Sequence, residues 1–219
     1  MKMNACKVMI KIWNKVHTVP AITCPTKKSP PTTGLLTRSA FEKRAQSLLA
    51  AGTPQSNHCV IYVDIDRLHV LNENLGMHVG DSVIVRVAEV IRQSLSPRML
   101  AARISGDRFA LFAGDASVDT TQQIAENLRA ALERLDFVNG TQAVDVSASF
   151  GVARVVESKH PLSHALAAAE IACKAAKDRG RGRVEVFQES DQSIVRRSAD
   201  VLVVQHLHEA LERDRVVLF

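Results

Sequence analysis

Residues 58–66, which read HCVIYVDID, constrain the fold of this chain more than any other stretch. An apolar, β-branched run of this length predicts a β-strand. The strand ends in Asp64 and Asp66, and because residues two positions apart in a strand share a face, both carboxylates leave the same side of its C-terminal end. Carboxylates in that position can hold a hard cation. Taken alone, such a strand end is more often only solvated.

The second constraint on the fold is a hairpin. Residues 99–104 and 109–113 are separated by the turn sequence SGDR, in which Gly106 supplies the permissive backbone that a tight turn needs. Asp107 lies at the tip of the predicted hairpin. If the hairpin lies beside the first strand, Asp64 and Asp107 converge, and Mg²⁺ binds through one or two carboxylates plus substrate phosphates. The pair therefore indicates phosphoryl chemistry, although a Gly-Asp turn alone is more often only a turn.

Apolar periodicity predicts the order of helices and strands. Helices are expected over residues 38–50, 78–95, 117–135 and 161–179, and strands over 58–64, the hairpin 99–113, 143–153 and 183–188. This order predicts an α/β fold: a ferredoxin-like palm with a mostly antiparallel, five-stranded sheet flanked by helices. The candidate site then lies at the end of the first strand, beside the hairpin tip.

Three further segments carry a family resemblance. They are residues 72–81 (NENLGMHVGD), 146–153 (VSASFGVA) and 176–181 (AKDRGR). Together with the strand and the hairpin, in this order and at these spacings, they resemble the GGDEF family of diguanylate cyclases. The resemblance runs from about residue 33 to 187, which is most of the chain.

The resemblance implies a metal site and a catalytic position. Asp64, the backbone carbonyl of Ile65 and Asp107 match the family's ligands for Mg²⁺ (or Mn²⁺). Asp107 also belongs to the catalytic signature, together with the next residue, Arg108. His69 and His78 have no partners at metal-ligand spacing, so no zinc site is predicted.

The resemblance also implies a GTP site. Asn72 and Asp81 match the pair that reads guanine, whose edge is complemented by an amide and a carboxylate. Lys177 and Arg181 match the cations that contact the phosphates. Taken alone, each has a simpler interpretation: Asp81 caps a helix, Asn72 closes a turn, and the two cations belong to a solvated helix end.

Arg108 departs from the family, which has its second acid at this position. That acid is expected to help hold the metals and to assist the 3′-hydroxyl that attacks the α-phosphate of the opposing GTP. Two unit charges about 4 Å apart interact by roughly 4 kcal/mol at an effective dielectric constant near 20, and each 1.4 kcal/mol is about tenfold in rate. A cation here therefore predicts impaired catalysis with GTP binding retained. Ser105, in place of the signature's first Gly, is expected to matter less.

Three functions stay open. The favoured one is a degenerate GGDEF domain of cyclic di-GMP signalling that binds GTP and regulates an attached EAL phosphodiesterase domain. The second is an active diguanylate cyclase, which joins two GTP into cyclic di-GMP plus two pyrophosphates across a homodimer. The third is a dimerisation scaffold that binds no nucleotide.

The chain is expected to divide into three parts. Residues 1–32 form a basic, Pro-rich leader, and residues 33–188 form the GGDEF domain. Residues 189–219 are predicted to form a linker helix and the first strand of a truncated EAL domain, because 208–216 (HEALERDRV) resembles the opening of that domain. None of the EAL metal or catalytic motifs is present in the chain, so no phosphodiesterase activity is expected from it.

The charge distribution bears on partners. The net charge of +5 arises in the first 33 residues, which hold six Lys and no acid, whereas the remainder has 22 basic against 23 acidic residues. Since no basic block alternates with aromatic residues in the domain, no nucleic-acid partner is predicted. Lys7, Lys11 and Lys15 fit a short basic helix that touches a membrane, but a plain leader is favoured.

The cysteines and the hydropathy bear on location. The four Cys are scattered without metal or redox spacing, which is typical of reduced thiols in the cytosol. No apolar run approaches the ~20 residues that span a bilayer, and no signal-peptide pattern is found. A cytoplasmic location is therefore expected.

Overall fold

A computed structural model of the chain describes residues 33–51, 56–135, 137–139, 142–156 and 161–188. The predicted leader, 1–32, and the predicted linker and EAL segment, 189–219, lie outside the described residues. Within the described part, none of the helices is both long and apolar enough to cross a membrane.

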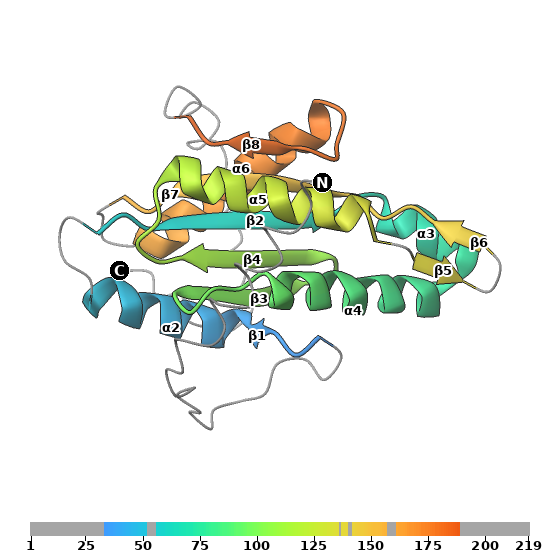
Figure 1. The fold of residues 1–219 in the computed structure, drawn as a ribbon, viewed down its shortest axis with the longest axis horizontal. Helices are drawn as coiled ribbons and strands as arrows, with labels where there is room; N and C mark the ends of the chain where they lie inside the picture. Colours follow the sequence, from blue (N-terminus) through green and yellow to red (C-terminus); the bar gives the residue numbers. More distant parts are fainter. Residues whose placement is uncertain (1–32, 52–55, 136, 140–141, 157–160, 189–219) are drawn as a thin grey trace, which may run out of the picture.

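A six-stranded sheet forms the centre of the domain (Figure 1). Its strands lie in the order β1-β3-β4-β2-β7-β8, and the three inner pairs, β3-β4, β4-β2 and β2-β7, are antiparallel, while the two outer pairs are parallel. The bounds are β1 (Leu36–Thr37), β2 (Cys59–Ile65), β3 (Met99–Ser105), β4 (Arg108–Ala113), β7 (Ala148–Arg154) and β8 (Val184–Val186). The order of β3, β4, β2 and β7 is that of a ferredoxin-like sheet, as the sequence predicts.

Helices cover both faces of this sheet. Figure 1 shows α4 and α5 on the near side, where they pack on Ile61 and Val63 of β2, while α2 and α6 pack on Val60 and Tyr62 from the other side. The helices are α2 (Arg38–Ala51), α3 (Leu68–Leu75), α4 (Met77–Gln93), α5 (Val118–Glu133) and α6 (Pro161–Asp178). Because strand residues alternate between faces, Asp64 shares the α6 side with Val60 and Tyr62.

Most of the predicted elements are confirmed, including the mixed α/β architecture and the hairpin, whose Gly106 has a φ of 45°. The five-stranded count is wrong by one strand, because the two-residue β1 pairs in parallel with β3 and is too short to leave a periodic signal. The predicted strand 143–153 is divided: β6 (Gln142–Val144) pairs with β5 (Phe137–Asn139) in a separate small sheet, and β7 begins at Ala148.

The helix α3 was not predicted. It fills the connection between β2 and α4, and Gly76, at a φ of 93°, ends α3 and begins α4. Only glycine adopts this positive φ freely. The residue therefore interrupts the helical path, and α4 starts in a new direction directly after α3. Apolar periodicity over eight residues is too short to distinguish such a helix from a turn.

Gly151 sets how closely α6 approaches the sheet. A Cβ built on this residue of β7 would lie 1.9 Å from the carbonyl oxygen of Ala169 and 2.3 Å from the backbone nitrogen of Cys173. The helix backbone therefore rests directly on the strand, which no other residue type permits. This contact holds the last turns of α6 over the end of β2.

Candidate functional site

The candidate site forms where β2 ends beside the hairpin tip. The backbone nitrogen of Ile65 donates a hydrogen bond to the carbonyl oxygen of Asp107 at 3.1 Å, and Asp64 lies opposite Arg108 in the antiparallel ladder. The predicted convergence of the strand end and the hairpin is therefore confirmed. Asp64 is buried, with only 8% of its surface exposed, although it carries an ionisable group.

Two cations of the chain face the Asp64 carboxylate. The Lys177 ammonium, in the last turn of α6, lies 2.6 Å from Oδ1, and Nε of Arg108 lies 3.5 Å from Oδ2. The Lys177 ammonium thus forms an ion pair with the buried Oδ1 and stabilises the charged form of the carboxylate. Lys177 thus pairs with a buried carboxylate at the helix end, and its predicted contact with phosphates stays a prediction.

Arg108 also faces a second carboxylate, that of Glu170. Its Nη1 lies 3.6 Å from Oε1 of Glu170, which projects from α6 two turns before Lys177. Burial, and then the charge of Glu170, raise the pKa of the neighbouring Tyr62 hydroxyl, while the Arg108 guanidinium opposes that rise. The guanidinium is therefore surrounded by Asp64, Glu170 and Tyr62.

The balance of burial and charge decides the state of Asp64. Burial is the largest effect and raises the pKa of the Asp64 carboxyl; the nearby Asp107 charge acts in the same direction. Lys177 and then Arg108 oppose the rise by stabilising the charged form. The cations of the chain therefore offset the effect of burial only in part, and the pKa of the Asp64 carboxyl stays raised.

Protein donors occupy the Asp66 carboxylate, contrary to the expectation that both carboxylates of the strand end can hold a cation. Its oxygens accept hydrogen bonds from the Ser149 hydroxyl at 2.8 Å, from the Ser147 hydroxyl at 3.1 Å and from the backbone nitrogen of Gly182 at 3.1 Å. Three protein donors thus occupy this carboxylate. Asp66 fixes the start of β7 and the loop after α6, which carries Arg181.

The predicted guanine-reading residues lie on two adjacent helices. Asn72 belongs to α3, and its Oδ1 lies 1.9 Å from where a Cβ on Gly80 of α4 would be. The Asn72 amide therefore lies against the backbone of Gly80, which directly precedes Asp81. The amide oxygen Oδ1 is buried without a hydrogen bond.

Asp81 is exposed in the second turn of α4, which begins at Met77, so the alternative that it caps this helix is wrong.

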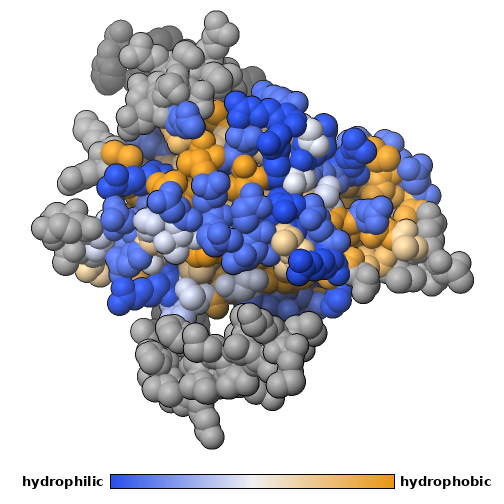
Figure 2. All heavy atoms as spheres, turned by 45° about the horizontal axis from the view of Figure 1, so that its top comes forward, coloured by the Kyte–Doolittle hydropathy of each residue, from blue (hydrophilic) through white to orange (hydrophobic). Residues whose placement is uncertain are grey.

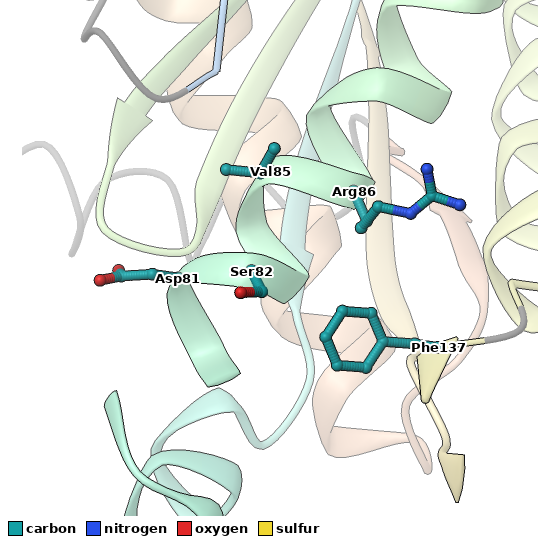
Figure 3. Close-up of a pocket in the computed structure, with 5 residues that line it drawn as sticks. All are labelled: Asp81, Ser82, Val85, Arg86 and Phe137. Atoms are coloured by element: carbon teal, nitrogen blue, oxygen red, sulfur yellow. The ribbon is translucent and has the colours of Figure 1, made fainter. Parts of the chain in front are cut away.

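A hollow of about 320 Å³ borders Asp81. It is lined mostly by apolar surface, and Figure 3 shows its lining side chains on α4 with the ring of Phe137 opposite them; the Asp81 carboxylate points away from that ring. The lining residues are Asp81, Ser82, Val85, Arg86 and Phe137. The Asp81 carboxylate is thus exposed at the side of the hollow away from Phe137 and is available to a ligand there.

The site has two parts. We call Asn72, Gly80 and Asp81, where base binding is predicted, the base half, and we call Asp64, Asp107, Arg108 and Lys177, where metal and phosphate binding is predicted, the phosphate half. Arg181 is exposed beyond α6 in the left-handed conformation (φ 64°), and its side chain makes no ion pair with the described part of the chain.

Figure 2 shows a largely hydrophilic surface with scattered apolar areas on the face that includes α6 and β8.

The predicted metal site can be tested against this arrangement. Two carboxylates and a backbone carbonyl are the oxygen ligands that Mg²⁺ prefers. As placed, however, they do not fit a resident ion, because both oxygens of Asp64 already face Lys177 and Arg108. Within the described residues, no three His, Cys, Asp or Glu side chains gather as a metal cluster. The metal prediction stays a prediction, and it requires Arg108 to leave Asp64.

Sequence reasoning missed Glu170 and Tyr62. Glu170 is seven residues before Lys177, which places both on one face of a helix, and Tyr62 is two residues before Asp64, which places both on one face of a strand. Both signals were present in the spacing. These spacings place Glu170 and Tyr62 beside the site only because α6 packs on this face of β2.

Comparison with known proteins gives consistent results. The family model described as "Diguanylate cyclase, GGDEF domain" matches residues 30–183. The probable diguanylate cyclase DgcE of Escherichia coli K12 is 30% identical over 157 residues, covering 71% of this chain and 14% of DgcE. The cyclic di-GMP phosphodiesterase PdeB of Shewanella oneidensis is 29% identical over 192 residues, covering 85% of this chain and 22% of PdeB.

The fold has solved counterparts as well. The GGDEF domain of DgcB from Caulobacter crescentus, crystallised in complex with c-di-GMP, matches with a TM-score of 0.70 at 25% identity, over 75% of this chain and 98% of that one. The chain therefore matches nearly all of an isolated domain of this kind, whereas it spans less than a quarter of the full-length relatives DgcE and PdeB.

Proposed function

The chain belongs to the GGDEF domain family, and we propose that it is a degenerate member that binds GTP in cyclic di-GMP signalling but forms little or no cyclic di-GMP. The proposal rests on the contrast between the two halves of the site. The base half keeps the residue types that complement guanine, and the phosphate half carries a cation where the family resemblance places an acid.

One observation carries the proposal. Arg108 lies opposite Asp64 in the ladder and directs Nε to its Oδ2 at 3.5 Å. In the family reaction, the acid at this position is expected to help hold metal and assist the attacking 3′-hydroxyl. A guanidinium cannot accept that proton, because it is already protonated throughout the physiological pH range. Turnover is therefore impaired more than binding.

Binding uses side chains that Arg108 does not disturb. The Asp81 carboxylate accepts from the N–H groups of guanine, and the Asn72 amide offers both a donor and an acceptor to the base. Arg181 can bind phosphate oxygens in a bidentate way, and Lys177 has three N–H donors, of which Asp64 needs only one. Mg²⁺ or Mn²⁺ would be held by Asp64, the Ile65 carbonyl and Asp107 only if Arg108 left Asp64, and the ion would then add countercharge to the phosphates.

The proposed partner is an EAL phosphodiesterase domain in the same polypeptide. Two observations support it: residues 208–216 resemble the opening of such a domain, and the similarity to PdeB covers more of the chain than residues 30–183. In this proposal the domain dimerises with a second copy and acts in the cytoplasm, where nucleotide occupancy regulates the attached enzyme.

Calorimetric titration of the purified chain with a non-hydrolysable GTP analogue, with the ATP analogue as control, tests the proposal. We expect guanine-selective binding that Asp81→Ala weakens at least tenfold. An absence of binding would contradict GTP binding and favour the scaffold. Steady production of cyclic di-GMP from GTP at high protein concentration would contradict the impairment and favour the active cyclase.

A further inference from the structure

The Asp64 carboxylate lies in an ion cluster formed by side chains of the chain itself. Its side chain is only 11% exposed, and both oxygens face cations that belong to the chain itself. A buried carboxylate requires a countercharge. Here Lys177 and Arg108 provide it, from a helix on one side and from the hairpin on the other.

The backbone fixes Arg108 in this position. Asp64 and Arg108 are directly opposite each other in the β2-β4 ladder, which continues through five further residue pairs to Cys59 and Ala113. Opposite residues in such a ladder have Cβ atoms about 4.5–5.5 Å apart. The guanidinium is thus tethered beside the carboxylate, whereas a free Mg²⁺ ion must be captured from solution and partly dehydrated.

Other groups hold the guanidinium there. Glu170 Oε1 lies 3.6 Å from its Nη1, and its charge also acts on the Tyr62 hydroxyl. A divalent ion beside Asp64 would have to displace Arg108 from two carboxylates at once. It would also lie close to the positive charge of Lys177, which contacts Oδ1 at 2.6 Å.

We propose that Arg108 takes the place of a divalent cation at Asp64, so that nucleotide triphosphate binds to this domain without Mg²⁺. The binding of nucleotide without Mg²⁺ rests on the proposed GTP binding, whereas the replacement of the cation at Asp64 does not. Arginine carries five N–H donors, and the contacts to Asp64 and Glu170 use Nε and Nη1. The remaining donors on Nη1 and Nη2 can bind phosphate oxygens, together with Lys177 and Arg181.

The first test is Mn²⁺ binding to the full chain without nucleotide, measured by electron paramagnetic resonance. We expect no submillimolar site in the wild type and a site at least tenfold tighter in Arg108→Glu, lost again in Arg108→Glu/Asp64→Asn. Arg108→Ala is the second variant, because it removes the cation without adding an acid and should also gain affinity. The matched control is Arg154→Glu, which reverses a charge at the opposite end of β7, beside Asn57, and should gain nothing.

A submillimolar Mn²⁺ site in the wild type that Asp64→Asn abolishes would overturn the proposal, as would equal Mn²⁺ affinity in the wild type and both Arg108 variants. Circular dichroism of each variant establishes that it is folded.

The second test compares the affinity for the GTP analogue in EDTA and in Mg²⁺. We expect the two dissociation constants of the wild type to agree within threefold, and those of Arg108→Glu to differ more than tenfold. A tenfold loss of wild-type affinity in EDTA would overturn Mg²⁺-independent binding. Absence of binding in both conditions would contradict the proposed function, and the Mn²⁺ series would still decide whether Arg108 replaces the ion at Asp64.

Discussion

The base half, on α3 and α4, and the phosphate half, at the end of β2, differ in how their side chains are paired. The base half keeps Asn72 and Asp81, and Gly80 between them leaves room for the Asn72 amide. The phosphate half keeps Asp64 and Lys177 but pairs them with Arg108. If the proposed function holds, residues that recognise the ligand and residues that transform it can change separately, because each half is held by its own secondary structure.

The largest expected effect removes the support of the phosphate half. Gly151→Ala introduces a Cβ at 1.9 Å from a backbone oxygen of α6, and backbone cannot yield as a side-chain end can. We expect a loss of about 3 kcal/mol in the free energy of unfolding. Urea denaturation followed by circular dichroism measures it.

Gly106→Ala is the control for that substitution. No atom lies within 4 Å of its added Cβ, so only the positive φ of 45° opposes it, and a loss of about 1 kcal/mol is expected. Equal losses at the two glycines would contradict the close approach of α6.

Asp66→Ala tests the connection between β2 and the loop that carries Arg181. The substitution leaves the donors of Ser149, Ser147 and Gly182 without their acceptor in a buried region, and we expect a loss of about 2–3 kcal/mol. Ser147→Ala removes one of the three hydrogen bonds and should cost about 1 kcal/mol. A stability unchanged by Asp66→Ala would show that the carboxylate does not organise this loop.

Gly80→Ala changes the base half alone. The added Cβ collides with the end of the Asn72 side chain, which can rotate away, so stability should fall by about 1 kcal/mol or less. Because the amide leaves its position, we expect about a tenfold loss of affinity for the GTP analogue, equal to about 1.4 kcal/mol. Ser82→Ala on the same helix, whose hydroxyl donates to the His78 carbonyl, should leave the affinity unchanged. Wild-type affinity in Gly80→Ala would remove Asn72 from the base site.

The smallest effect concerns Cys173, which lies beneath the phosphate half and donates to the Ser149 carbonyl. Burial raises the pKa of its thiol to about 12, so little thiolate exists at pH 8. The stability linked to this shift is present below the unfolded pKa near 9 and is lost as the pH rises toward 12. We expect no alkylation in the native state and rapid alkylation in urea, measured by peptide mass spectrometry. Native alkylation at pH 8 would mean that α6 leaves the sheet.

Sequence reasoning predicted the order of the elements because long apolar runs and hairpin turns have local signals. Contacts that depend on how α6 packs on β7 could not be predicted from the sequence. The spacing of Asp64 and Asp66, for example, predicted the same role for both carboxylates. Only Asp66, however, accepts hydrogen bonds from the hydroxyls of Ser149 in β7 and Ser147 just before it. Glu170 was missed for the same reason, since a helix face acquires a role only from what it packs on.

The most direct measurement is cyclic di-GMP formation from GTP and Mg²⁺ at high protein concentration by the wild type and Arg108→Glu, quantified by chromatography. Little or no product is expected from the wild type and at least a hundredfold increase in Arg108→Glu, because about 3 kcal/mol or more of the barrier is attributed to this one charge. Equal turnover by the two proteins, or none by either, would contradict the claim that Arg108 is the cause of the impairment.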